Sequence, residues 1–413
     1  MKLIHTFSYI MFMSLGLLLY SGCSCDSKTE KENGKTTIEQ TPVAVDTALR
    51  SRLVDFARQP RVNGQFGFHV YDLTADKSVF GFNERQAMSS ASCMKLLSGV
   101  AGLHLLGTNH MYQTSVYMRG RVEEGMLKGD VAFRAGLDPQ LQAPDMQKFA
   151  KAIKSKGISK IGGKLYVDLT LTEPVESEAH WYPWDLSFSR YGLLYKGHER
   201  VVRELKAALR GQGVSVLDSQ VVMGAVPQDA RCIYRLLRPI NHVTRRMWKN
   251  SSNIQATGML YTIGHKVNPN ADPILAGVDY LRTFLSDTLG LKDSTLVIHD
   301  GCGLCTHNHL SPLALTTILR FGYRHKSIYD RLYEELPIAG VDGTLRREMT
   351  GAKTRGKIRA KTGTLSHPYG ISSLAGYCMG SNGHLLAFAI MDTEMSVLDA
   401  RVLQRRLCEA MVK

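Results

Sequence analysis

The stretch Ala91-Ser92-Cys93-Met94-Lys95 decides how the chain is interpreted. It opens an apolar run, residues 96–106, with apolar residues on every side, which predicts a buried central helix. Ser92 and Lys95 are three residues apart, so on a helix their side chains share a face and meet. A serine hydroxyl becomes a nucleophile when a base takes its proton, and a buried lysine can be that base because burial lowers its pKa. No other Ser-x-x-Lys occurs in the chain. A pattern this short also fits a helix N-terminus with an unrelated lysine.

Two later fragments favour the catalytic interpretation. They are Ser251-Ser252-Asn253 and Lys361-Thr362-Gly363-Thr364. The motifs Ser-x-x-Lys, Ser-Asp-Asn and Lys-Thr-Gly, in that order, are typical of penicillin-binding proteins and serine β-lactamases. The order is kept here, and Ser252 stands where the second motif has Asp.

Length and charge limit the number of domains and the kind of partner that the protein can have. A chain of 413 residues is long enough for two or three domains. The formal net charge is +14, which indicates affinity for an anionic partner. No basic run is interleaved with aromatic residues and no nucleic-acid motif occurs, so we expect no nucleic-acid partner and favour an anionic polymer of the cell envelope.

The N-terminus is predicted to be a lipoprotein signal peptide, residues 1–22. Lys2 gives a positive start to a mostly apolar segment that is short for a membrane span. The end of this segment, Tyr20-Ser21-Gly22-Cys23, resembles a bacterial lipobox, with Cys23 as the lipidated residue, although Tyr20 departs from the usual small aliphatic residue. A plain signal peptide, an uncleaved anchor and lipidation at Cys25 are the alternatives.

The remaining chain divides into a tether and two folded parts. Residues 23–42 are polar and lack apolar residues to pack, which predicts a disordered tether. We expect a catalytic domain built from residues 43–112 and 240–413, interrupted by an inserted α+β subdomain at residues 113–239.

The periodicity of the chain predicts an α+β fold. A hairpin, residues 66–73 and 78–82, leads to Ser92, and the last third of the chain shows sequential antiparallel strands without alternating βαβ units. We also expect residues 244–263 to be largely helical, with Ser251 in the first half of this segment, and a strand over residues 295–298. The strands of the last third are expected at residues 356–361, 372–378 and 385–391, and terminal helices at residues 43–59 and 397–412.

Several segments besides the three motifs point to a single family. Because of these segments the chain, from about Phe66 to its C-terminus, resembles the peptidase S13 family. This family comprises the class C low-molecular-mass penicillin-binding proteins with D-alanyl-D-alanine carboxypeptidase and endopeptidase activity. The resemblance implies a penicillin-binding-protein/serine β-lactamase-like transpeptidase fold, an antiparallel sheet flanked by helices. The segments are Gly129-Asp130, Asp138-Pro139, Asp300-Gly301-Cys302-Gly303-Leu304, residues 336–345, residues 359–365 and residues 372–377.

The chain departs from the family pattern at a few positions. Cys93 stands where the family usually has Thr, Ser252 where it has Asp, and Cys302 and Cys305 replace serines. The span between residues 184 and 244 is shorter than in full-length members, so we expect the inserted region to be reduced.

The resemblance assigns roles to the motif residues. Ser92 is expected to be the nucleophile, Lys95 its base and Ser251 a proton relay to the leaving nitrogen. Asn253 is expected to hold the substrate amide and to orient Lys95. The expected binding site for the substrate carboxylate consists of Lys361, Thr362, Gly363 and Thr364.

A second cluster of potential ligands needs its own assessment. Cys302, Cys305, His307 and His309 lie within a short span, whereas zinc sites usually space their ligand pairs further apart. The matching family loop is not a metal site. We therefore predict packed or partly exposed thiols, with no metal and no cofactor.

The sequence thus predicts a penicillin-sensitive serine D-alanyl-D-alanine carboxypeptidase that acts on peptidoglycan stem peptides, with D,D-endopeptidase activity as an addition. No Glu-x-x-Leu-Asn lies between the second and third motifs, which favours a carboxypeptidase over a class A β-lactamase. The resemblance makes β-lactams covalent inhibitors, and the lipid anchor predicts a periplasm-facing lipoprotein of a Gram-negative-type envelope. The alternative is a non-catalytic peptidoglycan-binding lipoprotein that retains the fold.

Overall fold

The computed structural model describes residues 44, 46–59, 63–176, 178, 179, 181, 192–366 and 370–412. The predicted signal peptide, Cys23 and the whole predicted tether lie outside these residues, which begin at residue 44. Among the residues that the structure does describe, no helix is long and apolar enough to cross a membrane.

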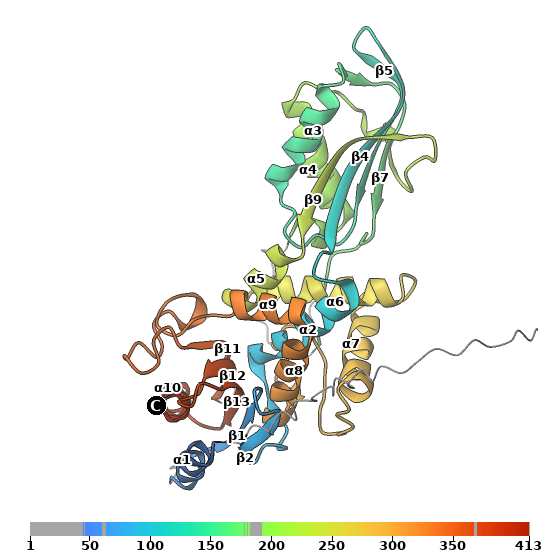
Figure 1. Ribbon diagram of the computed structural model, residues 1–413. Helices are drawn as coiled ribbons and strands as arrows, with labels where there is room; N and C mark the ends of the chain where they lie inside the picture. The colour runs from blue at the N-terminus through green and yellow to red at the C-terminus, as the bar shows by residue number, and fades with distance from the viewer. Residues whose placement is uncertain are drawn as a thin grey trace, which may run out of the picture. The chain divides into compact units, whose positions relative to one another are not determined.

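The first sheet is antiparallel and confirms the predicted α+β class. Its strand order is β11-β12-β13-β1-β2, so that the first and last parts of the chain meet in its centre. Figure 1 shows these strands together, blue beside red. The strands are β1 (Gln65–Asp72), β2 (Lys77–Phe82), β11 (Ile358–Leu365), β12 (Ile371–Met379) and β13 (Leu385–Thr393).

Helices cover both faces of this sheet. Helices α1 (Thr47–Arg58) and α10 (Val397–Met411) contact one another, and their apolar residues join one core with the sheet. Helices α2 (Met94–Leu106) and α8 (Pro312–Arg324) belong to the second, larger core. Strands β12 and β13 are buried along almost their whole length because side chains on both faces meet helices.

Helix α2 is buried on all sides, as its sequence predicted. Helix α5 (Asn241–Lys249) approaches it closely because position 99 is glycine: a Cβ there would lie 2.4 Å from Cζ2 of Trp248. The Trp248 Nε1–H donates to the Lys95 carbonyl at 2.8 Å, so the packing of these two helices also fixes the backbone of the Ser-x-x-Lys motif.

Residues 244–263 are largely helical, as predicted, but they form two helices and not one. Helix α5 ends at Lys249, and helix α6 (Asn253–Val267) begins after a break. Ser251 lies in this break with a φ of +57°, a left-handed conformation that no regular helix contains. The break turns Ser251 out of the helix.

Two further elements differ from the prediction. The expected strand at residues 295–298 is reduced to an isolated bridge between Val297 and His309. Helix α9 (Lys326–Glu335) was not expected. Helix α7 (Pro273–Thr283) continues into a π-helical segment (Phe284–Thr288).

The second sheet has the order β8-β7-β5-β4-β9, with β6 paired to β5. Strand β7 is parallel to both β5 and β8, and helices α3 (Met146–Lys154) and α4 (His198–Gly211) form the connections. These βαβ units were not predicted. Figure 1 shows both helices on the same face of the sheet, where their apolar residues form a separate core. The strands are β4 (Met111–Glu123), β5 (Met126–Ala135), β6 (Lys160–Ile161), β7 (Leu165–Leu169), β8 (Val221–Met223) and β9 (Arg231–Pro239).

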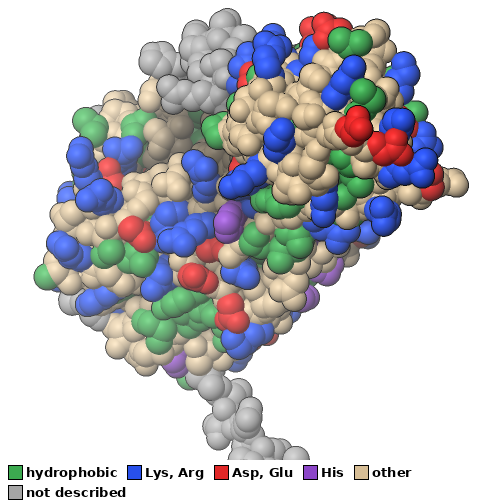
Figure 2. Space-filling view, turned by 90° about the horizontal axis from the view of Figure 1, so that it is seen from above, with side chains coloured by type: hydrophobic (Ala, Val, Ile, Leu, Met, Phe, Trp, Pro, Cys, Tyr) green, Lys and Arg blue, Asp and Glu red, His purple; other side chains and the backbone are tan. Residues whose placement is uncertain are grey.

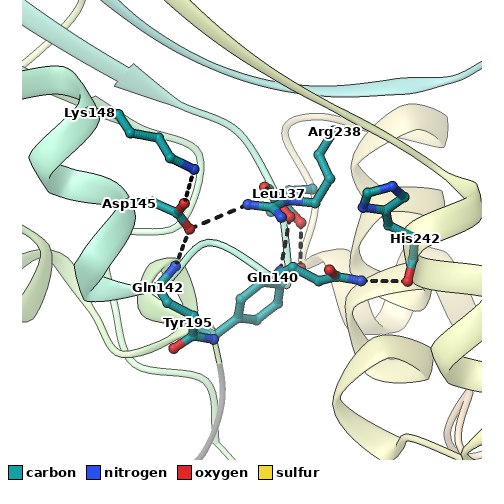
Figure 3. A network of polar contacts seen from close by, with 9 residues as sticks. Leu137, Gln140, Gln142, Asp145, Lys148, Tyr195, Arg238 and His242 are labelled. Atoms are coloured by element: carbon teal, nitrogen blue, oxygen red, sulfur yellow. Dashed lines mark hydrogen bonds and ion pairs between the residues drawn. The ribbon is translucent and has the colours of Figure 1, made fainter. Parts of the chain in front are cut away.

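A polar network lies where the second sheet meets helix α5 (Figure 3). Arg238 at the end of β9 bonds the buried Asp138 carboxylate at 2.8 Å and contacts Asp145 at 3.3 Å. Gln140 donates to the His242 carbonyl on α5. Burial raises the pKa of Asp138, and the Arg238 guanidinium opposes that effect.

A two-stranded sheet, β3 (Met88–Ser89) with β10 (His309–Leu310), lies just before the Ser-x-x-Lys motif. Lys and Arg side chains are spread over the face seen in Figure 2 and interspersed with acidic ones.

Candidate active site

Ser92 and Lys95 lie at the start of the buried helix. Ser92 is in a 3-10 turn (Ala91–Cys93), and Lys95 is in the first turn of α2. The Lys95 Nζ donates to the Ser92 Oγ at 2.7 Å. It also donates to the Asn253 Oδ1 at 2.8 Å and to the Cys302 carbonyl. The Lys95 side chain is completely buried, so these three contacts hold its amine in place.

The third motif reaches the site from strand β11, the edge of the first sheet. The Lys361 Nζ donates to the Ser251 Oγ at 2.8 Å and to the Thr362 carbonyl at 2.6 Å. Ser251 can be reached because the break between α5 and α6 presents it outward. The second and third motifs therefore touch through Ser251 and Lys361, and the first and second through Lys95 and Asn253.

Burial dominates the electrostatics of both lysines. It lowers the pKa of Lys95, while the Cys302 thiol and the Asp300 carboxylate act in the opposite direction. Burial and, to a smaller extent, the positive charge of Lys95 lower the pKa of Lys361 to about 7. Burial and mutual repulsion of the two amines favour the neutral form of one of them, which can then accept a proton.

Gly363 permits the close approach of β11 to the nucleophile. A Cβ at this position would lie 2.1 Å from the Ser373 Oγ and 2.6 Å from the Ser90 carbonyl oxygen. The Ser373 hydroxyl donates to that same Ser90 carbonyl at 2.7 Å. Gly363 was predicted to belong to the carboxylate-binding site, and in the structure it lets β11 pack against the turn that carries Ser92.

A cavity of about 220 Å³ opens onto these groups. It is wide enough for a short peptide end, and the described side chains around it are mainly hydroxyl-bearing or charged. Of the predicted site residues it is lined by Ser92, Ser251, Thr362, Gly363 and Thr364. Lys95, Asn253 and Lys361 are not part of the lining and reach it through their bonds: Lys95 contacts Ser92 and Asn253, and Lys361 contacts Ser251.

Several residues of the site were not identified from the sequence. Thr344 accepts a hydrogen bond at 2.7 Å from the Thr362 hydroxyl. An ion pair between Arg401 and Glu348, 3.0 Å long, lines the cavity. Arg401 lies on the C-terminal helix and Glu348 in a loop, so no local pattern marks them. The segment 336–345, quoted for its likeness to a family signature, was a usable signal for Thr344.

The residues that depart from the family pattern fit their positions. The buried Cys93 thiol donates to the Lys361 carbonyl at 3.3 Å, and burial raises its pKa. Ser252 is the N-cap of α6 and accepts from the Gln255 N–H, a role that Asp and Ser fill equally well. Cys302 is fully buried, and its carbonyl accepts from Lys95.

Comparison with known proteins gives one family. The model of the D-Ala-D-Ala carboxypeptidase 3 (S13) family matches residues 49–191 and 194–411. The chain is 21% identical to the D-alanyl-D-alanine carboxypeptidase DacB of Haemophilus influenzae, over 84% of this chain and 88% of that protein. It is 25% identical to a D-alanyl-D-alanine carboxypeptidase of Actinomadura sp., over 84% of this chain and 81% of that protein.

Solved structures have the same fold. Penicillin binding protein 4 of Haemophilus influenzae matches with a TM-score of 0.71 and 19% identity, over 86% of this chain and 97% of that one. That protein has also been solved in complex with a novel β-lactam. A penicillin G-acylated predatory endopeptidase of Bdellovibrio bacteriovorus matches with a TM-score of 0.54 and 14% identity, over 83% of this chain and 91% of that one.

Proposed function

Because the chain belongs to the D-Ala-D-Ala carboxypeptidase 3 (S13) family and is a serine-type D-alanyl-D-alanine carboxypeptidase, we propose that Ser92 is its nucleophile and Lys95 the base. The observation that carries this assignment is the 2.7 Å hydrogen bond between the buried Lys95 Nζ and the Ser92 Oγ. A nucleophile and a base within hydrogen-bond reach, with the base oriented by further partners, form the arrangement that covalent catalysis requires.

Acylation follows from this geometry. The Ser92 Oγ attacks the carbonyl carbon of the penultimate D-alanine, and its proton passes to the neutral Lys95 amine. The backbone N–H groups of Ser92 and Thr364 form the oxyanion hole, a contribution of about 3 to 4 kcal/mol for each donor. The proton that Lys95 accepted passes through Ser251 to the leaving nitrogen, so Lys95 is neutral again when the terminal D-alanine departs. Water then attacks the serine ester, with Lys95 again taking the proton.

Recognition of the free carboxylate falls to the Lys-Thr-Gly strand. The Lys361 ammonium supplies the charge, and the hydroxyls of Thr362 and Thr364 face the same cavity. Asn253, already bonded to Lys95, holds the substrate amide. A synthetic peptide ending in D-Ala-D-Ala is the substrate that tests this function: released D-alanine supports it, and folded protein that releases none supports the non-catalytic alternative.

The pH dependence of kcat/KM is expected to have an alkaline limb near pH 7. The pKa of Lys361 is lowered to about 7, so its amine is charged below that pH and neutral above it. A neutral amine no longer attracts the carboxylate, so kcat/KM should fall by about tenfold for each further pH unit. On the acid side the rate falls as well, because Lys95 must be neutral to accept a proton. A kcat/KM for a D-Ala-D-Ala peptide that stays constant from neutral to clearly alkaline pH would contradict the role of Lys361.

Replacement of Ser251 by glycine is expected to separate catalysis from stability. Ser251 has a φ of +57°, which costs an L-residue about 1–2 kcal/mol and glycine very little. This gain offsets the lost hydrogen bond from Lys361, so the unfolding free energy should change by no more than about 1 kcal/mol. Loss of the proton relay should lower kcat by about 10²-fold.

The matched control is Ser252→Gly, which alters the neighbouring cap and leaves the relay intact. It is expected to lower stability slightly, by a few tenths of a kcal/mol, with kcat largely kept. Equal kcat in Ser251→Gly and the parent would remove Ser251 from the mechanism.

The protein acts on peptidoglycan, so its function concerns the bacterial cell wall. Its relatives include a protein in complex with a β-lactam and a penicillin G-acylated endopeptidase, which supports covalent inhibition by β-lactams and a D,D-endopeptidase activity here. We place the catalytic domain at residues 43–112 and 240–413 and the inserted subdomain at 113–239. The second sheet, with its separate core, supports this division.

The lipoprotein form is a further part of the proposal. Cys23 is lipidated, residues 23–42 tether the enzyme, and the enzyme faces the periplasm. Expression of the parent in a Gram-negative host should give a membrane-associated form that carries diacylglycerol on its N-terminal cysteine, detected by mass spectrometry. Cys23→Ser should lose the lipid and leave D-alanine release unchanged, whereas lipid that persists in Cys23→Ser would point to Cys25.

A further inference from the structure

Three potential metal ligands converge beside the loop that supports Lys95. They are the Glu178 carboxylate, a His299 ring nitrogen and the Cys305 Sγ, whose ligand atoms all lie within 4.8 Å of one another. Cys305 is fully buried, and the other two side chains are half-buried. The short spacing of Cys302, Cys305, His307 and His309 argued against a metal, but the structure combines Cys305 with residues outside that span.

The chemistry of this trio suits a zinc-type ion. Thiolate, imidazole and carboxylate are the donors that Zn²⁺ prefers, and three protein ligands plus water complete its tetrahedral shell. In such a shell neighbouring ligand atoms are roughly 3.5 Å apart, so closure from the observed separation needs side-chain shifts of about 1 Å. Glu178 lies on a loop between β7 and α4, where a side chain can make such a shift.

The charges also favour a cation at this point. Glu178 and Cys305 are two potential anions in a poorly solvated place, and a divalent ion between them removes their mutual repulsion. The imidazole of His307 lies close by, with its ring centroid 6.1 Å from that of His299, and is a further potential donor.

We propose that Glu178, His299 and Cys305 bind one divalent transition-metal ion of the zinc type, with water as the fourth ligand. Binding replaces the proton of the Cys305 thiol, which is released to solvent, and forms the metal–sulfur bond. The ion ties the loop that carries Glu178 to the loop of residues 299–308.

This tie leads directly to the catalytic lysine. The Asp300 carboxylate, next to His299, accepts from the Cys305 N–H at 2.8 Å and from the Cys302 N–H at 2.9 Å. The Cys302 carbonyl in turn accepts from the Lys95 Nζ. Trp181, three residues after Glu178, donates to the same Asp300 at 2.8 Å. A metal here therefore braces the loop that positions Lys95, and the site is structural and not part of the peptidase chemistry.

Cobalt(II) is the probe for this site, because thiolate ligation gives it an intense near-ultraviolet charge-transfer absorption. Full-length protein, purified in detergent and freed of metal with a chelator, is titrated with Co²⁺ and then with Zn²⁺. We expect one equivalent of Co²⁺ to produce the thiolate band and Zn²⁺ to abolish it by displacement. With Zn²⁺ at about 100 times its Kd, the thermal midpoint should rise by a few degrees.

Variants decide whether the trio is the site. Cys305→Ser should lose the thiolate band, and Glu178→Gln, which removes a half-buried charge and keeps the size of the side chain, should weaken Co²⁺ binding at least tenfold with the circular dichroism spectrum unchanged. The matched control is Cys232→Ser, which removes an exposed thiol outside the trio and should keep the band. A thiolate band that survives in Cys305→Ser, or equal Co²⁺ affinity in Glu178→Gln and the parent, overturns the proposal. A titration without any thiolate band overturns it as well.

Discussion

Ser92→Ala is expected to abolish covalent labelling of the protein by fluorescent penicillin and to lower D-alanine release by about 10⁴-fold or more. The acyl bond forms on the Ser92 Oγ, and alanine has no atom to replace it. The side chain sits in a short turn and its one described polar contact is the Lys95 amine, so the fold should survive the change. The measurement is a fluorescent-penicillin gel on parent and variant, with a thermal melt of each.

Ser90→Ala is the matched control for this experiment. Ser90 is buried and immediately precedes the turn, and the one described hydrogen bond of its hydroxyl is to the Ala91 carbonyl, at 3.4 Å. Labelling should therefore persist in Ser90→Ala. A band that remains in Ser92→Ala places the acyl group on another residue. Absence of a band in both the parent and Ser90→Ala, from folded protein, would favour the non-catalytic peptidoglycan-binding alternative.

The order of the three motifs identified the family, whereas local patterns predicted only part of the fold. The strands β1, β2, β11, β12 and β13 were predicted because each is a short apolar or alternating segment, and these strands pair with one another in the first sheet. The parallel pairing of β5 with β7 was missed, since no local pattern specifies which distant strands meet. The family and the carboxypeptidase function predicted from the sequence are confirmed.

The site shows the same limit. The contact between Lys95 and Ser92 follows from helical spacing, and the structure contains it. The contact between Lys361 and Ser251 does not follow from spacing, because it depends on a left-handed residue in a break that helix propensity conceals. The trio of Glu178, His299 and Cys305 was not found from the sequence either, because Glu178 is far along the chain from the loop that carries the other two.

Lys95→Met is expected to lower the rate of penicillin acylation by about 10³-fold, within the range that a general base contributes. Methionine fills the fully buried space of the lysine stem but cannot accept the Ser92 proton. The change also removes the desolvation cost of a buried amine. In the free energy of folding, this gain offsets the hydrogen bonds from Lys95 that Asn253 and the Cys302 carbonyl lose. The thermal midpoint should therefore change little, while the acid limb of the acylation–pH profile, caused by protonation of Lys95, disappears.

Lys95→Arg tests whether the residue acts as a base or only as a buried cation. Arginine stays protonated at every accessible pH, so it can orient Ser92 and neutralise nearby charge but cannot take a proton. If Lys95 is the base, acylation in Lys95→Arg should be as slow as in Lys95→Met. If a cation is all that the site needs, Lys95→Arg should keep much of the parental rate, and the proton would have to pass to another group.

Lys361→Met separates the roles of the two lysines. It should weaken recognition of the substrate carboxylate, seen as a higher KM, yet keep the acid limb of the pH profile that belongs to Lys95. This comparison assigns proton transfer to one amine and substrate charge to the other, two tasks that the buried environment makes possible because it lowers the pKa of both.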